Sequence, residues 1–229
     1  MESRHERASE IDLVALDLDG TLVDSAPDIN HCVGLALIAA GHPAPTLDQT
    51  RSMIGGGIDL LIRRALDASG GHDEHSLGIA LARFHACYRD NLFERSRLYA
   101  GVTDTIATLH RAGIRLCCIT NKRSDYAIRL LELAALRDRF AFVFGGDSFP
   151  EKKPHPRPLI EAARSVGARA DRCTLVGDAS QDCRAAAAAG FRFVWAAYGY
   201  CRSLDEVADS ASYERIESFD ELATVLRAA

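Results

Sequence analysis

The alternation of short apolar runs with helical patterns constrains the fold of this chain more than any other feature of its sequence. Five runs have the length of a buried strand, and they lie at Leu13–Leu18, Ile114–Ile119, Phe140–Phe144, Cys173–Val176 and Phe191–Ala197. Helical patterns between them end at glycines, as at Gly113, Gly167 and Gly190. Strands that alternate with helices form a parallel sheet covered by helices. We therefore expect an α/β fold, with a Rossmann-like core whose central parallel sheet is flanked by helices.

A long segment after the first run departs from this alternation. It contains helical patterns at Asn30–Ala40, Ile58–Ala68 and Leu77–Phe93, but no convincing strand. An inserted all-helical domain is the simplest account of this segment. We therefore divide the chain into a core domain, residues 1–24 and 97–229, and a helical cap domain, residues 25–96.

Three consecutive glycines in this segment, Gly55 to Gly57, resemble a phosphate-binding loop in composition alone. No strand precedes them, and no Lys-Ser or Lys-Thr pair follows at the spacing such a loop requires. A turn that opens a helix is the favoured interpretation.

Composition and charge exclude several classes of protein. The chain has 229 residues, 48% of them hydrophobic, which is enough for a sizeable core. Its net charge of −5 argues against binding to nucleic acid or to an anionic membrane through bulk charge. The first ten residues lack the apolar region of a secretory signal, and no apolar stretch has the length of a membrane span. We expect a cytoplasmic protein, and the sequence carries no signal for an oligomeric state.

The cysteine pattern favours reduced thiols. Seven cysteines are an odd number, none are spaced as CxxC, and Cys117 and Cys118 are adjacent. Such spacing is typical of neither a disulfide framework nor a zinc site. We interpret all seven as reduced thiols of the core or surface.

Polar residues follow three of the five apolar runs. Asp17 and Asp19 follow the first run, Thr120 and Asn121 follow the second, and Asp178 follows the fourth. In an open parallel sheet, ligands bind at the carboxyl ends of the strands. A single acid at a strand end is commonly a helix cap or a solvated loop residue, but three such endings in order indicate one shared site.

The spacing of Asp17 and Asp19 suggests a division of labour. Side chains two residues apart in an extended segment point to the same face, so both carboxylates can address one substrate atom. The first can act as a nucleophile, while the second donates a proton to the leaving group and later accepts one from water. Gly20 permits a tight exit from the strand.

Electrostatics predicts a cation at this site. Asp17, Asp19, Asp178 and Asp182 would bring up to four negative charges together, and two unit charges about 4 Å apart repel by about 4 kcal/mol at an effective dielectric of about 20. One lysine, Lys153, does not balance that charge. A divalent cation with oxygen ligands does, and Mg²⁺ suits such a site. We expect Asp178 as a metal ligand and Asp182 as its outer support, although Asp182 at a helix start can also simply complement the helix dipole.

A cation beside these acids favours an anionic substrate, and phosphate is the natural candidate. Lys153, Thr120, Asn121 and Gly20 are the expected phosphate-binding residues. Lys153 lies in the proline-rich segment EKKPHPRP, which can hold one ammonium in a fixed place, and Lys152 is the alternative candidate.

At this point the sequence resembles the haloacid dehalogenase-like superfamily of phosphohydrolases over nearly its whole length. DLDGT matches the first motif of that superfamily, Thr120 the second, Lys153 the third and GDxxxD from Gly177 the fourth. The resemblance implies that Asp17 is a nucleophile that forms an aspartyl-phosphate and that Asp19 is a general acid and base. It also implies Mg²⁺ bound by Asp17, the Asp19 backbone carbonyl and Asp178, beneath a mobile helical cap.

Within the superfamily, the stretches LDLDGTLVDSAPD, IGGGIDLLIRRAL, ITNK, GGDSFPEKKPHPRPL and YGY resemble those of the bacterial phosphoglycolate phosphatases. The resemblance implies hydrolysis of a small phosphorylated metabolite, 2-phosphoglycolate, to glycolate and phosphate. Phosphatases of sugar phosphates, amino-sugar phosphates or pyrophosphate, and phosphomutases, remain alternatives, as does a phosphoryl-accepting signalling domain that is not an enzyme. Arg63 or Arg64 is a candidate contact for a substrate carboxylate.

Overall fold

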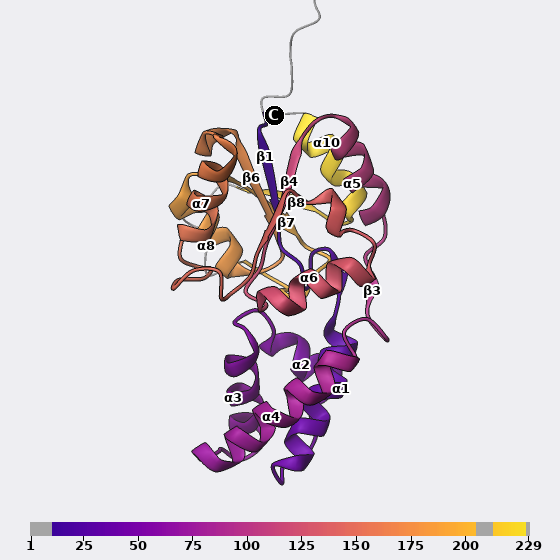
Figure 1. Cartoon of the computed structure of the whole chain (residues 1–229), viewed down its shortest axis with the longest axis vertical. Coiled ribbons are helices and arrows are strands. Elements are labelled where there is room, and N and C mark those ends of the chain that lie inside the picture. Colours follow the sequence, from indigo (N-terminus) through magenta and orange to yellow (C-terminus); the bar gives the residue numbers. More distant parts are fainter. Residues whose placement is uncertain (1–10, 205–212, 228–229) are drawn as a thin grey trace, which may run out of the picture.

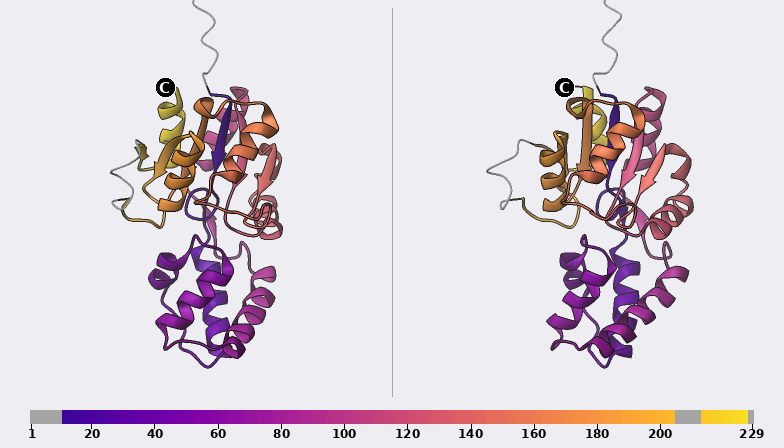
Figure 2. Two further views of the ribbon diagram at one scale, coloured as in Figure 1. Left: turned by 90° about the vertical axis from the view of Figure 1, so that its left-hand side faces the viewer. Right: turned by 60° about the vertical axis from the view of Figure 1, so that its left-hand side comes forward.

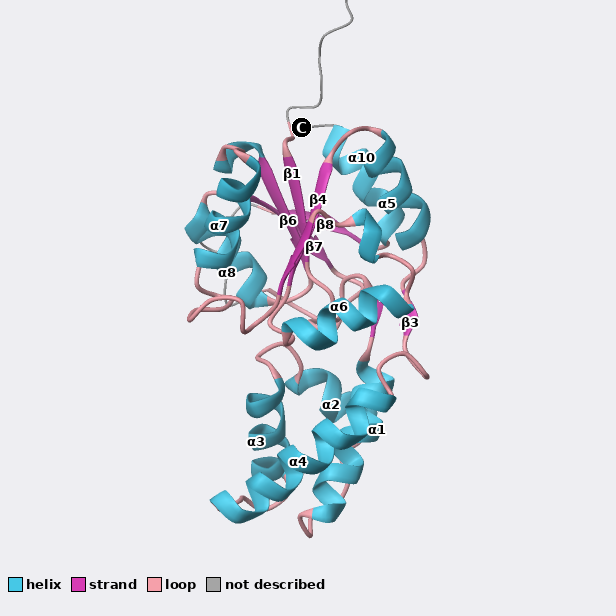
Figure 3. Ribbon diagram, in the orientation of Figure 1, coloured by secondary structure: helices cyan, strands magenta, loops and turns pink. Residues whose placement is uncertain are grey.

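The computed structural model describes residues 11–204 and 213–227 and contains a six-stranded parallel sheet (Figures 1 and 3). The strand order is β5-β4-β1-β6-β7-β8. The strands are β1 Leu13–Leu16, β4 Arg115–Ile119, β5 Phe142–Phe144, β6 Cys173–Gly177, β7 Arg192–Ala196 and β8 Glu214–Ile216. The predicted α/β class is confirmed, and each of the five apolar runs contains a strand. The prediction missed β8, because its sequence Glu-Arg-Ile contains a single apolar residue.

Helices cover both faces of the sheet. Figure 1 shows α7 and α8 on one side of it and α5 and α10 on the other. The helices of this part are α5 Val102–Arg111, α6 Ser124–Leu133, α7 Arg157–Val166, α8 Ser180–Ala189 and α10 Leu222–Arg227, with short 3₁₀ turns at Arg137–Arg139, Ala170–Arg172 and Phe219–Glu221. Alternate residues of β1 pack on opposite faces of the sheet, because successive side chains of a strand point in opposite directions. Leu13 belongs to the apolar cluster that includes Leu159 of α7, whereas Val14 belongs to the cluster that includes Ile106 of α5.

The segment between β1 and β4 is largely helical and lies beyond the carboxyl ends of the strands (Figure 2). Its helices are α1 Ala26–Ala39, α2 Leu47–Met53, α3 Ile58–Ala68 and α4 Glu74–Asp90. The prediction missed α2, whose start is fixed by a capping box between Thr46 and Gln49. We refer to α1–α4 and their connections as the helical segment. The division into a core of residues 1–24 and 97–229 and a cap of residues 25–96 stays a prediction, and its residues 1–10, 205–212 and 228–229 lie outside the described ranges.

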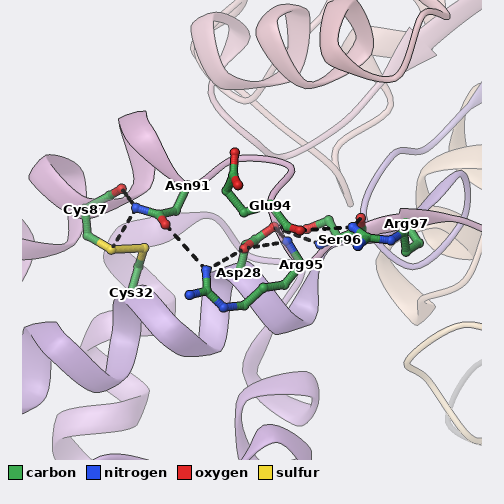
Figure 4. A network of polar contacts seen from close by, with 8 residues as sticks. All are labelled: Asp28, Cys32, Cys87, Asn91, Glu94, Arg95, Ser96 and Arg97. Atoms are coloured by element: carbon green, nitrogen blue, oxygen red, sulfur yellow. Dashed lines mark hydrogen bonds and ion pairs between the residues drawn. A yellow bond between two sulfur atoms is a disulfide. The ribbon is translucent and has the colours of Figure 1, made fainter.

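Two short strands connect the helical segment to the sheet. β2 Val23–Asp24 leads out and pairs antiparallel with β3 Arg97–Leu98, which leads back. Beside this pair, the fully buried Asp28 carboxylate accepts hydrogen bonds from the backbone N–H groups of Arg95 and Ser96 at 3.0 and 2.8 Å (Figure 4). The Ser96 hydroxyl donates a further bond at 2.6 Å. Asp28 therefore ties the outgoing chain to the returning chain.

The cysteine prediction is wrong for two residues. Cys32 of α1 and Cys87 of α4 form a disulfide, with their Cα atoms 5.5 Å apart (Figure 4). The two lie 55 residues apart in sequence, so only the packing of α1 against α4 reveals the pair. The remaining cysteines are free, and four of these five are buried.

None of the helices within residues 11–204 and 213–227 combines the length and the apolar character needed to cross a membrane.

Candidate active site

The end of β1 places the two central aspartates. The backbone N–H of Asp17 donates to the Val176 carbonyl of the neighbouring strand at 2.9 Å, so Asp17 continues the sheet and its carboxyl group lies at the strand end. The chain then turns at Gly20, which has a φ of +82°. A Cβ atom at this position would also collide with the Asp178 carboxylate. Glycine at position 20 is therefore required both by the backbone conformation and by the close approach of the third aspartate.

Lys153 lies in the middle of the acidic group. Its ammonium is 2.9 Å from Asp17 Oδ1 and 2.6 Å from Asp182 Oδ1, and it donates to the Ile119 carbonyl at 2.7 Å. The side chain is fully enclosed. The alternative candidate, Lys152, instead donates to the Gly56 carbonyl of the helical segment at 2.7 Å. Of the two lysines, it is therefore Lys153 that contacts the acids.

Asp178 and Asp182 lie at the end of β6 and the start of α8, and both are buried. Asp178 Oδ2 accepts a hydrogen bond from the Tyr200 N–H at 2.8 Å. Both oxygens of Asp182 have partners within the protein, since Oδ1 contacts Lys153 and Oδ2 accepts from the Ala179 N–H at 3.0 Å. Asp182 thus supports Lys153 and the helix start at the same time.

These contacts leave the site with excess negative charge. Burial raises the pKa of Asp17 to about 6, opposed by Lys153 and reinforced by Asp182. Burial, with the charges of Asp182 and Asp17, raises the pKa of Asp178 well above its usual value. Burial opposes the charge of Lys153, but the attraction of Asp17 and Asp182 outweighs it and raises the pKa of the ammonium. One lysine among three carboxyl groups favours a further cation.

The geometry fits a metal ion. Asp17, Asp178 and Asp182 each offer an oxygen, and these three atoms lie within 4.8 Å of one another. The donor set is made only of oxygen, which suits a hard divalent cation. The three acids therefore form a group that could bind a metal.

Asp19 lies in a different environment from Asp17. Its two carboxylate oxygens accept hydrogen bonds from the Lys122 ammonium at 2.9 and 3.0 Å, and Oδ1 also accepts one from the Ser25 hydroxyl. Lys122 is buried, and its ammonium lies 4.9 Å from the ring centroid of Tyr88 in α4. Lys122 and Ser25 were not predicted as site residues. Lys122 follows Thr120 and Asn121 in the stretch ITNK, and that neighbourhood was the available signal.

Thr120 and Asn121 lie at the end of β4, as expected, and both are buried. The Asn121 side chain donates to the Lys153 carbonyl at 2.8 Å and to the Gly55 carbonyl at 2.9 Å. The Gly55 carbonyl also accepts from Gln181 at 2.6 Å. Asn121 thus joins the lysine segment to the helical segment across the site.

The glycine segment is a turn that opens a helix, which confirms its predicted structure. Gly55 and Gly57 have φ angles of +121° and +90°, and α3 begins at Ile58. Its carbonyl groups face the core, where Asn121, Gln181 and Lys152 donate to them.

A pocket of about 890 Å³ lies between the sheet edge and the helical segment. Asp17, Asp19, Thr120, Asn121 and Asp178 line it from the core. From the helical segment, Arg64 lines the pocket, whereas Arg63 is not among the lining residues. The Arg63 Nη1 atom lies 3.6 Å from Glu74 Oε1 and 3.3 Å from His72 Nε2. Of the two arginines that the sequence offered, Arg64 is the one at the pocket.

Residues 14–196 match the model of the haloacid dehalogenase-like hydrolase family. The chain belongs to this family, and it is a phosphoric monoester hydrolase like the curated relatives that it matches. In sequence it is similar to the phosphoglycolate phosphatase of Nitrosococcus oceani, with 37% identity over 95% of this chain and 97% of the relative. The phosphoglycolate phosphatase of Aliivibrio fischeri is 38% identical over 96% of this chain and 98% of the relative.

Solved structures agree with this assignment. A structure described as a predicted phosphoglycolate phosphatase from Haemophilus somnus has a TM-score of 0.89 and 29% identity, and the match covers 94% of this chain and 98% of that one. A putative phosphoglycolate phosphatase from Lactobacillus delbrueckii has a TM-score of 0.85 at 20% identity, over 94% of this chain and 98% of that one, which shows the shared fold.

Proposed function

We propose that this protein is a Mg²⁺-dependent phosphatase that hydrolyses 2-phosphoglycolate to glycolate and phosphate. The observation that carries the proposal is the group of buried carboxyl groups of Asp17, Asp178 and Asp182 around Lys153. Of these residues, Asp17 and Asp178 line the pocket that the helical segment lines from the other side. The names of the curated relatives support the choice of substrate.

In this proposal, Mg²⁺ is held by Asp17, the backbone carbonyl of Asp19 and Asp178. When bound, the metal neutralises phosphate charge and polarises its oxygens. Asp182 supports the site from outside, because its two oxygens already bind Lys153 and the Ala179 N–H. Lys153, Thr120, Asn121 and Gly20 are assigned to the phosphate group. Thr120 and Asn121 line the pocket, and Lys153 supplies the positive charge from its enclosed position beside Asp17.

The chemistry assigned to the two aspartates proceeds in two steps. A carboxylate oxygen of Asp17 attacks phosphorus, the bond from phosphorus to the ester oxygen breaks, and Asp19 gives that oxygen a proton. Water then attacks the phosphorus of the aspartyl-phosphate and passes a proton to Asp19, which releases phosphate and restores Asp17. The hydrogen bonds from Lys122 and Ser25 fix the Asp19 carboxyl group for this exchange.

Release of inorganic phosphate tests the proposal directly. Initial rates on 2-phosphoglycolate, pyrophosphate and several sugar phosphates, with Mg²⁺ and with a chelator, are compared. We expect Mg²⁺-dependent turnover that is fastest on 2-phosphoglycolate. Stable, stoichiometric labelling of the protein without phosphate release would instead indicate a phosphoryl-accepting domain, and rearrangement of a hexose phosphate would indicate a mutase.

We also propose that the helical segment acts as a mobile cap over the pocket and that the protein works in the cytoplasm. Disulfides are uncommon in that reducing compartment. Measuring the redox state of Cys32 and Cys87 in rapidly quenched cells therefore tests the location, and a fully oxidised pair would count against it.

A further inference from the structure

The part of the pocket formed by α3 and α4 is mostly apolar. α3 contributes Ile58, Leu61 and Arg64, spaced along one face of the helix, and α4 contributes Phe84 and Tyr88, four residues apart. We call these five residues the cap wall. Its polar groups are the Arg64 guanidinium and the Tyr88 hydroxyl, and neither has a role in the chemistry described above.

Arg64 carries a positive charge that no carboxylate of the described residues balances. Its Nη1 donates to the Met53 carbonyl at 3.3 Å, and it forms no ion pair with a carboxylate of residues 11–204 or 213–227. Arg51 of α2, which also lines the pocket, differs in this respect. It lies 3.1 Å from Asp24 and 3.5 Å from Asp48. Arg64 is therefore available to an anion in the pocket, whereas Arg51 is already paired.

The hydroxyl group of Tyr88 is a second, independent indication that this part of the pocket can bind an anionic group. The residue is 1% exposed, and its hydroxyl oxygen makes no well-aligned hydrogen bond among the described residues, although the Lys122 ammonium lies beside it. A buried hydroxyl without a partner costs about 1–3 kcal/mol. Its ring lies against Lys122, which holds Asp19, so this hydroxyl lies close to the reacting end of the pocket. An acceptor oxygen of a bound molecule would satisfy it.

We propose that the cap wall is a subsite for a second anionic group of the substrate, with Arg64 as the charged contact and Tyr88 as a neutral donor. This inference rests on the proposed function and narrows the substrate class to phosphate esters of short hydroxy acids. The phosphate group lies at Lys153 and Asp17, and the carboxylate faces the cap wall. An ester that lacks the carboxylate leaves Arg64 and Tyr88 without a partner.

The test compares two substrates in matched variants. 2-Phosphoglycolate and ethyl phosphate share the phosphate and the two-carbon chain, but only the first has a carboxylate. In Arg64→Ala, we expect the KM for 2-phosphoglycolate to rise about 10- to 100-fold, the range for a lost charged hydrogen bond, while the kinetics on ethyl phosphate stay unchanged. Arg63→Ala is the control, because it removes the same charge from the same helix away from the pocket. It should leave both substrates unchanged.

Tyr88→Phe provides the second measurement. The hydroxyl makes no well-aligned hydrogen bond within residues 11–204 and 213–227, so its removal should not lower the midpoint of unfolding. The KM for 2-phosphoglycolate should rise about 2- to 10-fold. A merely structural role for this hydroxyl would lower stability and leave KM unchanged.

The possible failures are distinguishable. Arg202 also lines the pocket, outside the helical segment. Equal effects of Arg64→Ala on both substrates, equal effects of Arg63→Ala and Arg64→Ala, or a larger effect of Arg202→Ala would overturn the subsite while the phosphatase proposal stands. If the unmodified protein hydrolyses none of the esters, the proposed function itself fails, and the subsite fails with it.

Discussion

Functional residues are brought together in different ways at the carboxyl ends of the strands, which we call the sheet edge, and in the helical segment. At the sheet edge, adjacent strands place Asp17, Thr120 and Asp178 side by side, so strand pairing alone brings the acids together. In the helical segment, Asp28 binds the backbone near Ser96, and packing brings together groups that are far apart in sequence. The residues assigned to the chemistry therefore lie where the regular pairing of strands can be recognised from the sequence, although they too are far apart along the chain. The proposed substrate contacts of the helical segment, its disulfide and the hydrogen bonds of Asp28 all depend on tertiary packing.

The largest expected effect lies at the sheet edge. Asp17→Asn removes the attacking oxygen's charge while keeping the shape of the side chain, so we expect kcat to fall by about 10⁴-fold or more. Initial rates on 2-phosphoglycolate measure this. Asp104→Asn, which changes an exposed acid of α5, is the control and should keep full activity. Full turnover by a folded Asp17→Asn variant would refute the assigned nucleophile.

The same contrast explains how much could be predicted from sequence. Five strands and the placement of Asp17, Asp19, Thr120, Asn121 and Asp178 followed from apolar runs and from what ends them. Lys153 was instead predicted from its proline-rich segment, and Asp182 from its position at the start of a helix. β8 and α2 were missed because they are short and carry weak patterns. The disulfide, the contact of Lys122 with Asp19 and the bonds to the Gly55 carbonyl were missed for another reason. Each joins residues whose proximity arises only from packing between elements.

The disulfide should matter to the helical segment but not to the chemistry. Closing a loop of this length restricts the unfolded chain, so reduction of Cys32–Cys87 should lower the free energy of unfolding by about 2–4 kcal/mol. The kcat should change less than about twofold, because the catalytic acids lie on the sheet edge. Urea unfolding with and without a thiol reductant measures the first, and steady-state rates the second.

The double variant Cys32→Ser, Cys87→Ser is the control for the reductant. Its stability should be the same with and without reductant, because the five free cysteines remain as they are. A reductant effect of equal size in this variant would assign the loss of stability to something other than the disulfide.

The next largest effect is expected from the hydrogen bonds of the Asp28 carboxylate to Arg95 and Ser96. Asp28→Asn replaces a carboxylate oxygen with an N–H₂ group that faces the donors of Arg95 and Ser96, so we expect a loss of about 2 kcal/mol in the free energy of unfolding. Asp90→Asn, at an exposed position of α4, should change stability by less than about 0.5 kcal/mol. Equal unfolding midpoints for the two variants would contradict the role of Asp28.

The smallest expected effect returns to the sheet edge and concerns pH. Burial raises the pKa of Asp17 from 3.8 in the unfolded chain to about 6 in the folded protein. Without metal, the folded state therefore favours the protonated carboxyl group. This contribution to stability is complete below pH 3.8 and is lost as the pH rises towards 6. Mg²⁺ should restore stability above pH 6, where the carboxylate is ionised. Because the pKa of Asp17 is about 6 and that of Asp178 is also raised, Mg²⁺ competes with protons at pH 5 and should bind at least about tenfold more weakly than at pH 8, which is about 1.4 kcal/mol. Thermal unfolding with Mg²⁺ and with a chelator at both pH values measures this difference. Equal Mg²⁺ stabilisation at pH 5 and pH 8 would contradict Asp17 and Asp178 as carboxylate ligands of the metal.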